Sequence, residues 1–132
     1  MAQKKKMRIV IADDEAHIRK LITAFMKSMN AVVVGEAENG NQAVELYRKE
    51  KPNLMLLDVN MPQKTGELVL KEIRAEFPDA FVIMLTGVSD MDTVQKCLEL
   101  GAANFIRKDT PIPEMKDIIK DTWRMFKKGK GS

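Results

Sequence analysis

The chain has one cysteine, one histidine and no long apolar run. The single Cys97 excludes an intramolecular disulfide, so we expect a protein of a reducing compartment, the cytoplasm. A zinc site is not expected either, because His17 and Cys97 are the only residues of their types. No apolar stretch approaches the ~20 residues that span a membrane. The three lysines at 4–6 precede a strand-length run without a small-residue cleavage site, so no signal peptide or membrane partner is expected.

Charge is distributed unevenly along the 132 residues, although the net charge is only +3. All 19 acidic residues fall between Asp13 and Asp121, whereas basic residues crowd the two ends, at 4–8 and 124–130. Basic ends could contact nucleic acid or lipid headgroups. Solvated termini are the simpler interpretation, so we expect no direct nucleic-acid binding. The length and a hydrophobic content of 45% predict one domain with its own core.

Short apolar runs alternate with helical patterns five times, which predicts right-handed crossovers and a parallel sheet. The expected strands are 7–12, 31–37, 54–58, 81–85 and 104–107. A helical spacing of apolar residues follows each expected strand. Asn39 or Asn41 is the expected cap of the second helix. The fourth helix is expected at 93–100, and the last one begins at about Pro113. Five strands favour an α/β, doubly wound (βα)5 flavodoxin-like fold with strand order 2-1-3-4-5. We expect a tail at 1–6, the domain at 7–128 and a second tail at 129–132.

Polar residues follow four of the strands: Asp13, Asp14, Asp58, Thr86 and Lys108. The carboxyl ends of parallel strands share the edge of the sheet at which open α/β folds bind ligands. Crowded carboxylates repel one another unless a cation neutralises them. Their oxygens favour Mg²⁺, with Mn²⁺ as the alternative. Either aspartate of the first pair, taken alone, could instead cap the following helix.

A reaction that uses all of these groups is phosphoryl transfer to a carboxylate. An aspartate beside Mg²⁺ can act as a nucleophile and form an aspartyl phosphate. The equatorial oxygens of the transferred group then need neutralisation, which the cation, a lysine and a hydroxyl can supply. The residues at this edge therefore predict a phosphoryl-transfer site.

Four segments in this order and spacing resemble the receiver domain of two-component response regulators, in particular the CheY-like single-domain type. They are IVIADDE at 9–15, LLDVNMPQKTG at 56–66, VIMLTG at 82–87 and GAANFIRK at 101–108. The resemblance covers the chain from Met7 to about Lys128.

The resemblance implies a phosphoacceptor and a metal site. Asp58 matches the phosphoacceptor of the family. Mg²⁺ would be bound by Asp14, by Asp58 and by the backbone carbonyl of Asn60, with Asp13 acting through a water molecule. The cofactor implied is thus a single divalent cation.

The resemblance also implies how the phosphoryl group is held and sensed. Lys108 and Thr86 would bind the phosphoryl oxygens, and Gly87 would leave room beside them. Thr86 would swing inward, and Phe105 would turn from an exposed to a buried rotamer, so that the two residues form a switch. Plain packing is the alternative interpretation of Phe105.

The function implied is a signalling switch rather than an enzyme with a separate substrate, although self-phosphorylation and slow self-dephosphorylation belong to it. A histidine kinase would supply the phosphoryl group. The face built from the fourth helix, the fifth strand and the last helix would then bind a target protein or a second receiver, in chemotaxis or another phosphorelay.

Two alternatives remain open from the sequence. The chain could be the receiver half of a DNA-binding transcriptional regulator. It could also be a small Mg²⁺-dependent phosphatase with an aspartyl-phosphate intermediate. That chemistry needs an acid two residues after the nucleophile, where this sequence has Asn60.

Three positions depart from the pattern of the family. Asp109 follows Lys108, where a proline in a cis peptide is usual, so we expect a trans bond or a locally rearranged loop, because a cis non-proline peptide costs about 2.5–4 kcal/mol. Val88 cannot hydrogen-bond an attacking water, which leaves the phosphoryl lifetime open. Phe105 lacks the hydroxyl of the commoner tyrosine, so a switch there depends on shape.

Overall fold

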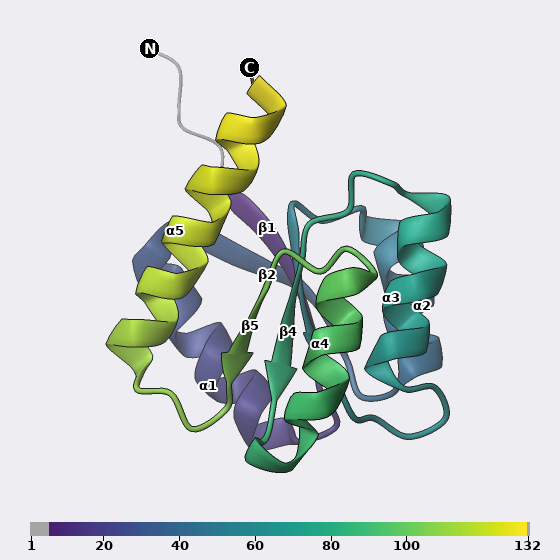
Figure 1. Ribbon diagram of the computed structural model, residues 1–132. Coiled ribbons are helices and arrows are strands. Elements are labelled where there is room, and N and C mark those ends of the chain that lie inside the picture. Colours follow the sequence, from purple (N-terminus) through teal and green to yellow (C-terminus); the bar gives the residue numbers. More distant parts are fainter. Residues whose placement is uncertain (1–5, 132) are drawn as a thin grey trace.

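Five parallel strands form a single sheet in the order β2-β1-β3-β4-β5 (Figure 1). The computed structural model describes residues 6–131, the last four of them by backbone alone. The strands are β1 (Met7–Ala12), β2 (Ala31–Ala37), β3 (Leu54–Asp58), β4 (Val82–Thr86) and β5 (Asn104–Arg107). The predicted flavodoxin-like sheet and its strand order are confirmed.

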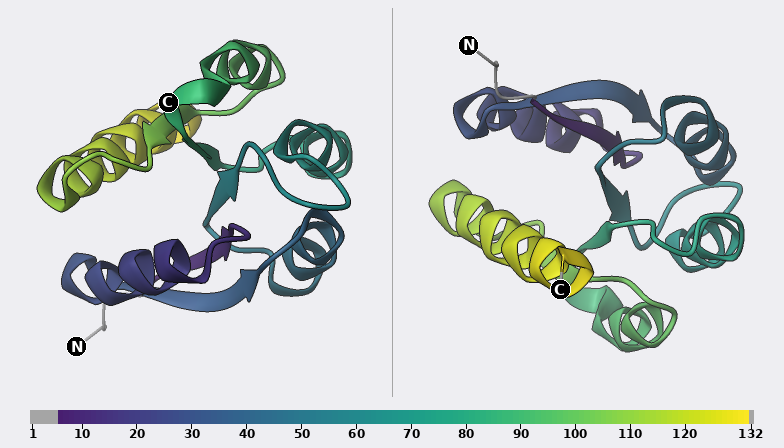
Figure 2. Two further views of the ribbon diagram at one scale, coloured as in Figure 1. Left: turned by 90° about the horizontal axis from the view of Figure 1, so that it is seen from below. Right: turned by 90° about the horizontal axis from the view of Figure 1, so that it is seen from above.

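Helices cover both faces of the sheet. Figure 2 shows α1 (Ala16–Met26) and α5 (Ile112–Gly131) on one side of the sheet. The other side carries α2 (Gly40–Glu50), α3 (Gly66–Glu76) and α4 (Met91–Glu99). Two short 3₁₀ turns, Lys27–Met29 and Val88–Asp90, complete the regular structure. No helix in the described part of the chain is long and apolar enough to span a membrane.

Alternate residues of each central strand pack against opposite helix layers. In β3, which is buried along its whole length, Leu54 and Leu56 belong to the core that α1 and α5 cover. Met55 and Leu57 belong to the core beneath α2, α3 and α4. A strand covered on both faces needs apolar residues at every position, which explains the uninterrupted apolar run before Asp58.

The start of α2 resolves the choice between two asparagines. The side chain of Asn39 accepts a hydrogen bond of 2.9 Å from the backbone N–H of Gln42 and caps the helix. Asn41 lies inside the helix, and its amide donates to Gln63 instead. The N–H groups of the first helical turn have no intrahelical acceptor, so a cap at Asn39 stabilises the turn that follows β2.

Two helix limits differ from the expectation. Helix α4 begins at Met91, two residues before the expected start at 93, because the 3₁₀ turn Val88–Asp90 runs directly into it. It ends at Glu99, followed by Leu100 as its cap and by Gly101, whose φ of +104° is a backbone conformation that suits glycine. Helix α5 continues to Gly131, past residue 128, where the sequence placed the end of the domain.

Candidate functional site

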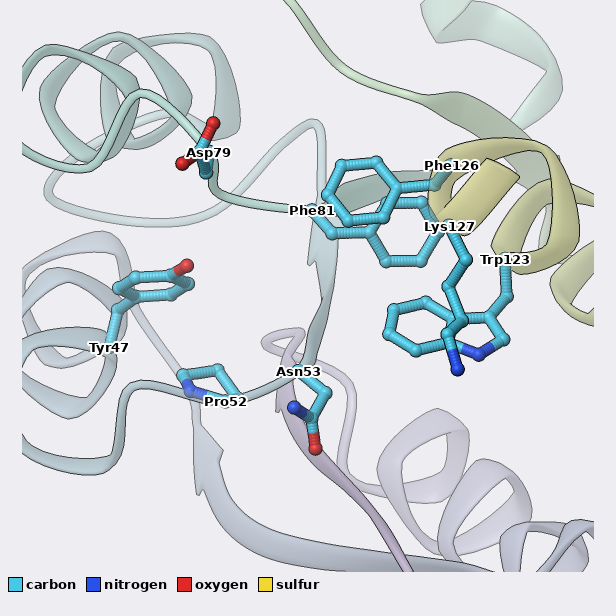
Figure 3. Close-up of a pocket in the computed structure, with 8 residues that line it drawn as sticks. All are labelled: Tyr47, Pro52, Asn53, Asp79, Phe81, Trp123, Phe126 and Lys127. Carbon is cyan, nitrogen blue, oxygen red and sulfur yellow. The ribbon is translucent and has the colours of Figure 1, made fainter. Parts of the chain in front are cut away.

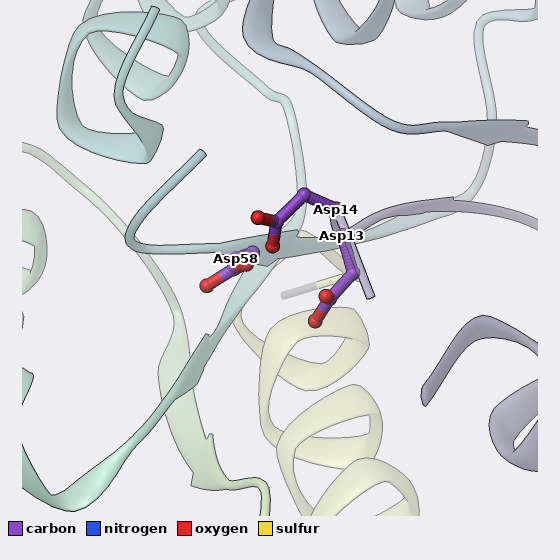
Figure 4. Close-up of side chains that lie close together, drawn as sticks. All are labelled: Asp13, Asp14 and Asp58. Atoms are coloured by element: carbon purple, nitrogen blue, oxygen red, sulfur yellow. The ribbon is translucent and has the colours of Figure 1, made fainter. Parts of the chain in front are cut away.

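Three carboxylates meet where β1 and β3 end. These strands are neighbours, with Ala12 paired to Leu57, so the residues that follow each of them lie side by side. One oxygen from each of Asp13, Asp14 and Asp58 lies within 4.8 Å of the others (Figure 4). Asp13 and Asp58 are 0% and 1% exposed, whereas Asp14 is open to solvent. The structure therefore brings the three predicted carboxylates together, two of them buried.

Lys108 supplies the positive charge at this cluster. Its Nζ lies 3.1 Å from Asp58 Oδ2 and 3.0 Å from Asp13 Oδ2. The same Nζ lies 3.0 Å from Glu15 Oε2, at the rim of the site. The backbone N–H of Lys108 donates to the carbonyl of Thr86 at 2.9 Å, which extends the pairing of β4 with β5 and fixes the start of the side chain. One ammonium thus bridges carboxylates from two other strands.

Backbone N–H groups bind one oxygen of each buried aspartate. Asp58 Oδ1 accepts a hydrogen bond of 3.0 Å from the N–H of Asn60. Asp13 Oδ1 accepts one of 2.8 Å from the N–H of Glu15. Both contacts span two residues in sequence, so each aspartate forms a local turn with its own chain. The second oxygen of each residue faces Lys108.

Burial raises the pKa of both buried carboxyls above that of an exposed aspartate. Burial raises the pKa of Asp58 to about 7, and the charge of Asp13 adds to this, while the Asn60 N–H and Lys108 oppose it. Burial likewise raises the pKa of Asp13 against the opposing effects of the Glu15 N–H and Lys108. For Lys108, burial alone would lower the pKa, but the surrounding carboxylates outweigh it and raise the pKa above its usual range. The site therefore has more negative charge than one lysine neutralises.

The oxygen cluster fits a divalent cation. Asp13 Oδ2 is buried, and among the described residues its one close polar neighbour is the Lys108 ammonium at 3.0 Å, in an ion pair rather than a hydrogen bond. A buried carboxylate oxygen without a hydrogen bond is costly unless another ligand satisfies it. Three converging carboxylates, one of them exposed for entry, are a donor set that Mg²⁺ accepts. The carbonyl of Asn60 remains a predicted ligand.

Gly66 allows the loop after Asp58 to fold back over the site. A Cβ atom at this glycine would lie 2.1 Å from the carbonyl oxygen of Asp58 and 2.9 Å from Val59 Cα. The N–H of Gly66 donates to the carbonyl of Val59 at 2.9 Å, so the approach of the two backbones is also bonded. Thr65 caps α3 immediately before it, with its hydroxyl accepting from the N–H of Leu68. Only glycine fits where α3 begins against the end of β3.

The remaining predicted site residues border the cluster. Thr86 is fully buried at the end of β4, and its hydroxyl donates to the carbonyl of Gly87 at 2.8 Å. Gly87 has free space on its Cβ side, since the nearest atom to that position is Asp90 Oδ2 at 3.6 Å. Phe105 is partly buried and packs against the core beneath α2, α3 and α4. The predicted movements of Thr86 and Phe105 remain predictions.

Two charged residues at the site have no role in the sequence interpretation. Glu15 binds Lys108, and its place directly after two aspartates was the available signal. Arg19, one helical turn further along α1, donates to the carbonyl of Asp13 and pairs with Glu36 at 3.1 Å. The sequence around Arg19 gives no sign of this role, because the contacts of an arginine on a helix depend on how the helix packs.

The segment that replaces the usual proline is held by an ion pair. No cis peptide bond occurs in the described residues, which confirms the expected trans bond after Lys108. Arg107 donates to both carboxylate oxygens of Asp109, at 2.7 and 3.0 Å. This solvent-exposed fork joins the residues on the two sides of Lys108, where the proline is missing.

Comparisons with a family model, with related sequences and with solved structures all point to one family. Residues 9–120 match the model of the response regulator receiver domain. The chain is 36% identical over 115 residues to the chemotaxis protein CheY of Bacillus subtilis, covering 87% of this chain and 96% of CheY. It is 38% identical over 110 residues to the transcriptional regulatory protein YhcZ of the same species, covering 83% of this chain but only 51% of YhcZ.

A solved structure of a receiver domain has the same fold as this chain. The receiver domain of AraT, a response regulator from Geobacillus stearothermophilus, superposes with a TM-score of 0.85 and 26% identity, covering 94% of this chain and 98% of the other. The family match spans most of the chain and includes every element that brings the acidic cluster and Lys108 together. The chain therefore belongs to the response regulator receiver domain family of two-component signalling proteins.

Proposed function

We propose that Asp58 accepts a phosphoryl group and that the chain signals through this modification. The observation that carries the proposal is the contact between Asp58 Oδ2 and Lys108 Nζ at 3.1 Å, within a buried cluster of three carboxylates. A structural ion pair would need one carboxylate for one ammonium. This site gathers three, and burial raises the pKa of Asp58 to about 7, a pattern typical of functional rather than structural charges.

In the proposed reaction an ionised Asp58 oxygen forms a bond to phosphorus, and the bond from phosphorus to a histidine nitrogen of the kinase breaks. The electron pair of that bond stays on the histidine nitrogen, and the imidazole leaves as a neutral group because its other ring nitrogen already carries a proton. Asp58 must be deprotonated to attack, and the ammonium of Lys108 favours its ionised form. Lys108 then passes from a carboxylate oxygen to an oxygen of the phosphoryl group, to which it donates.

Asp13, Asp14, Asp58 and the carbonyl of Asn60 would hold Mg²⁺, or Mn²⁺ in its place. The bound cation supplies neutralisation of the negative charge that develops on the phosphoryl oxygens. The buried oxygen of Asp13 without a hydrogen bond supports this assignment. Asp14, exposed beside two buried aspartates, is the ligand that an entering ion reaches first.

The output of the switch would be the surface of α4, β5 and α5. Thr86 ends β4, and its hydroxyl is bound to Gly87 in the described state. A phosphoryl group on Asp58 offers that hydroxyl a stronger, charged acceptor. Movement of Thr86 would vacate or fill space near Phe105, which packs beside β4 on the neighbouring strand. A histidine kinase upstream and a target protein or second receiver downstream are the proposed partners, with chemotaxis as one setting.

Hydrogen exchange tests this proposal. Wild-type protein and Asp58→Asn are compared with Mg²⁺ alone and with Mg²⁺ plus acetyl phosphate. We expect acetyl phosphate to change amide exchange in β4, α4 and β5 of the wild type and to leave the variant unchanged. The same exchange pattern in both proteins, with and without acetyl phosphate, would contradict a phosphorylation switch.

A second candidate is the receiver half of a DNA-binding regulator. It is favoured by YhcZ, a transcriptional regulatory protein of which this chain matches only about half. Under this proposal the same switch would control a DNA-binding domain encoded further along the same reading frame. Sequencing the reading frame beyond Ser132 distinguishes the two candidates.

A further inference from the structure

A cavity lies at the amino ends of the strands, at the opposite edge of the sheet from the acidic cluster. It has a volume of about 670 Å³ and opens between the end of α1, the start of β1 and helix α5. Its floor reaches fully buried core residues, among them Ile9, Met26 and Ile119. We call this the amino-edge cavity. Ligand pockets in proteins have volumes of roughly 300–1,000 Å³ and mainly apolar walls, so the cavity is of suitable size and lining.

The fold brings the basic residues from both ends of the chain to the rim of this cavity. Lys6 and Arg8 come from the first strand and the residue before it, and Lys120 and Lys127 from the last helix. None of the described residues that line the cavity is acidic. Arg8 is neutralised by Glu50 at 2.9 Å, but no described residue forms an ion pair with the three lysines. Three ammonium groups without an ion-pair partner among the described residues therefore surround an apolar floor.

An aromatic wall separates this cavity from a neighbouring one of about 440 Å³, whose lining Figure 3 shows. Trp123, Asn53 and Lys127 line both. The indole of Trp123 lies 5.2 Å from the ring of Phe81, and the Lys127 ammonium lies 5.6 Å from the centroid of the indole. A flat indole beside a cation offers a surface on which a planar group can stack.

We propose that the amino-edge cavity binds a small organic anion with a flat apolar body. The apolar part would lie on the buried floor against Trp123, and the negative group would face Lys6, Lys120 and Lys127. Charge complementarity selects this occupant: an uncharged apolar ligand would leave three ammonium groups at the rim without a partner, and a simple inorganic anion would leave the apolar floor bare. This site is independent of Asp58 and of the phosphoryl chemistry at the other edge of the sheet.

The chain provides its own reporter for this site, because Trp123 is its only tryptophan. The probe is 8-anilinonaphthalene-1-sulfonate, which joins a planar ring system to one negative charge and accepts energy from an excited indole. Its neutral analogue, N-phenyl-1-naphthylamine, keeps the rings without the sulfonate. We expect the anionic probe to quench Trp123 by energy transfer with saturable, one-site binding. The neutral analogue should bind at least about tenfold more weakly, and salt should reduce the difference.

Two charge reversals on one helix complete the test. Lys120→Glu changes a rim residue, whereas Lys116→Glu makes the same change one turn earlier at a residue that does not line the cavity. We expect the first variant to weaken binding of the anionic probe about tenfold and the second to leave it within about twofold, with both folded by circular dichroism. Equal binding by the two variants, or equal affinity for the charged and neutral probes, would overturn the proposal. The proposal would also be overturned if the anionic probe did not bind and the protein bound only an anionic polymer such as an oligonucleotide.

Discussion

The Lys108 ammonium lies 3.1 Å from Asp58 Oδ2, although 50 positions separate the two residues in sequence. Their strands are not neighbours, since β4 lies between β3 and β5. The side chain of Lys108 therefore crosses the end of β4, where Thr86 is buried, to reach the acidic cluster. This single contact places the ion pair, the hydroxyl and the carboxylates at one point of the sheet edge.

The substitution Asp58→Asn should stabilise the metal-free protein at alkaline pH. Because burial raises the pKa of Asp58 from 3.8 to about 7, the folded protein holds a proton that the unfolded chain releases. The folded state is therefore favoured at low pH, and this contribution is lost as pH rises towards 7. At pH 8, with a chelator present, the variant should exceed the wild type in free energy of unfolding by about 1–3 kcal/mol. Urea unfolding at pH 5 and pH 8 measures the difference, which should shrink at pH 5. A difference that does not change with pH would contradict the raised pKa.

Removal of the lysine should have the opposite effect. Lys108→Ala leaves Asp13 and Asp58 buried without their counter-ion, so we expect a loss of about 2–4 kcal/mol in unfolding free energy at pH 8 without metal. The loss should be smaller at pH 5, because protonated carboxyls need no counter-ion. Lys71→Ala, at an exposed lysine of α3, is the matched control and should change stability by less than about 0.5 kcal/mol. Equal effects of the two substitutions would show that Lys108 is an ordinary surface lysine.

A methyl group at Gly66 should disrupt the site by moving backbone. The added Cβ would lie 2.1 Å from the Asp58 carbonyl oxygen, and backbone on both sides leaves little room to relax. We expect Gly66→Ala to cost about 2–3 kcal/mol and to weaken Mg²⁺ binding, as measured by thermal unfolding and isothermal titration. Gly87→Ala, at the same sheet edge, has its nearest atom at 3.6 Å and should fold with near wild-type stability. Comparable stability of the two alanine variants would be evidence against the close approach.

The cap of α2 offers a test away from the site. Asn39→Ala removes the acceptor for the Gln42 N–H and should cost about 1 kcal/mol. Asn41→Ala loses only an exposed side-chain contact to Gln63 and should cost less than about 0.5 kcal/mol. Chemical denaturation of both variants measures the difference. A larger loss of unfolding free energy in Asn41→Ala than in Asn39→Ala would contradict the assignment of Asn39 as the cap.

Most of the fold could be predicted from the sequence because the central strands are buried on both faces. Leu54–Asp58 and Val82–Thr86 read as apolar runs for that reason, and the polar residue that ends each run lies at the functional edge. The start of α4 could not be placed, since no side chain caps it and the 3₁₀ turn before it has no distinct pattern. The Arg107–Asp109 fork was also beyond prediction, because two opposite charges two positions apart do not by themselves predict a contact. Glu15, directly after two aspartates, did carry a signal, but its contact with Lys108 depends on how the fold places that lysine.

The amino-edge cavity is a second feature that could not be predicted from the sequence. The basic residues at the two ends of the chain were interpreted as solvated termini, because nothing in the sequence says that the ends meet. The sheet places the start of β1 beside α5, so that Lys6 and Lys127 line one cavity. Charges that look unrelated over 120 positions thus become a single feature of the surface.

The most direct test of the account is the intact mass of the protein after incubation with Mg²⁺ and acetyl phosphate. The wild type should gain the mass of one phosphoryl group, and the gain should disappear with a chelator or with Asp58→Asn. Lys120→Glu, at the far edge of the sheet, should be labelled like the wild type and serves as the control. A wild type that stays unlabelled under a rapid quench, or an Asp58→Asn variant labelled to the same extent as the wild type, would contradict the assignment of Asp58 as the phosphoacceptor.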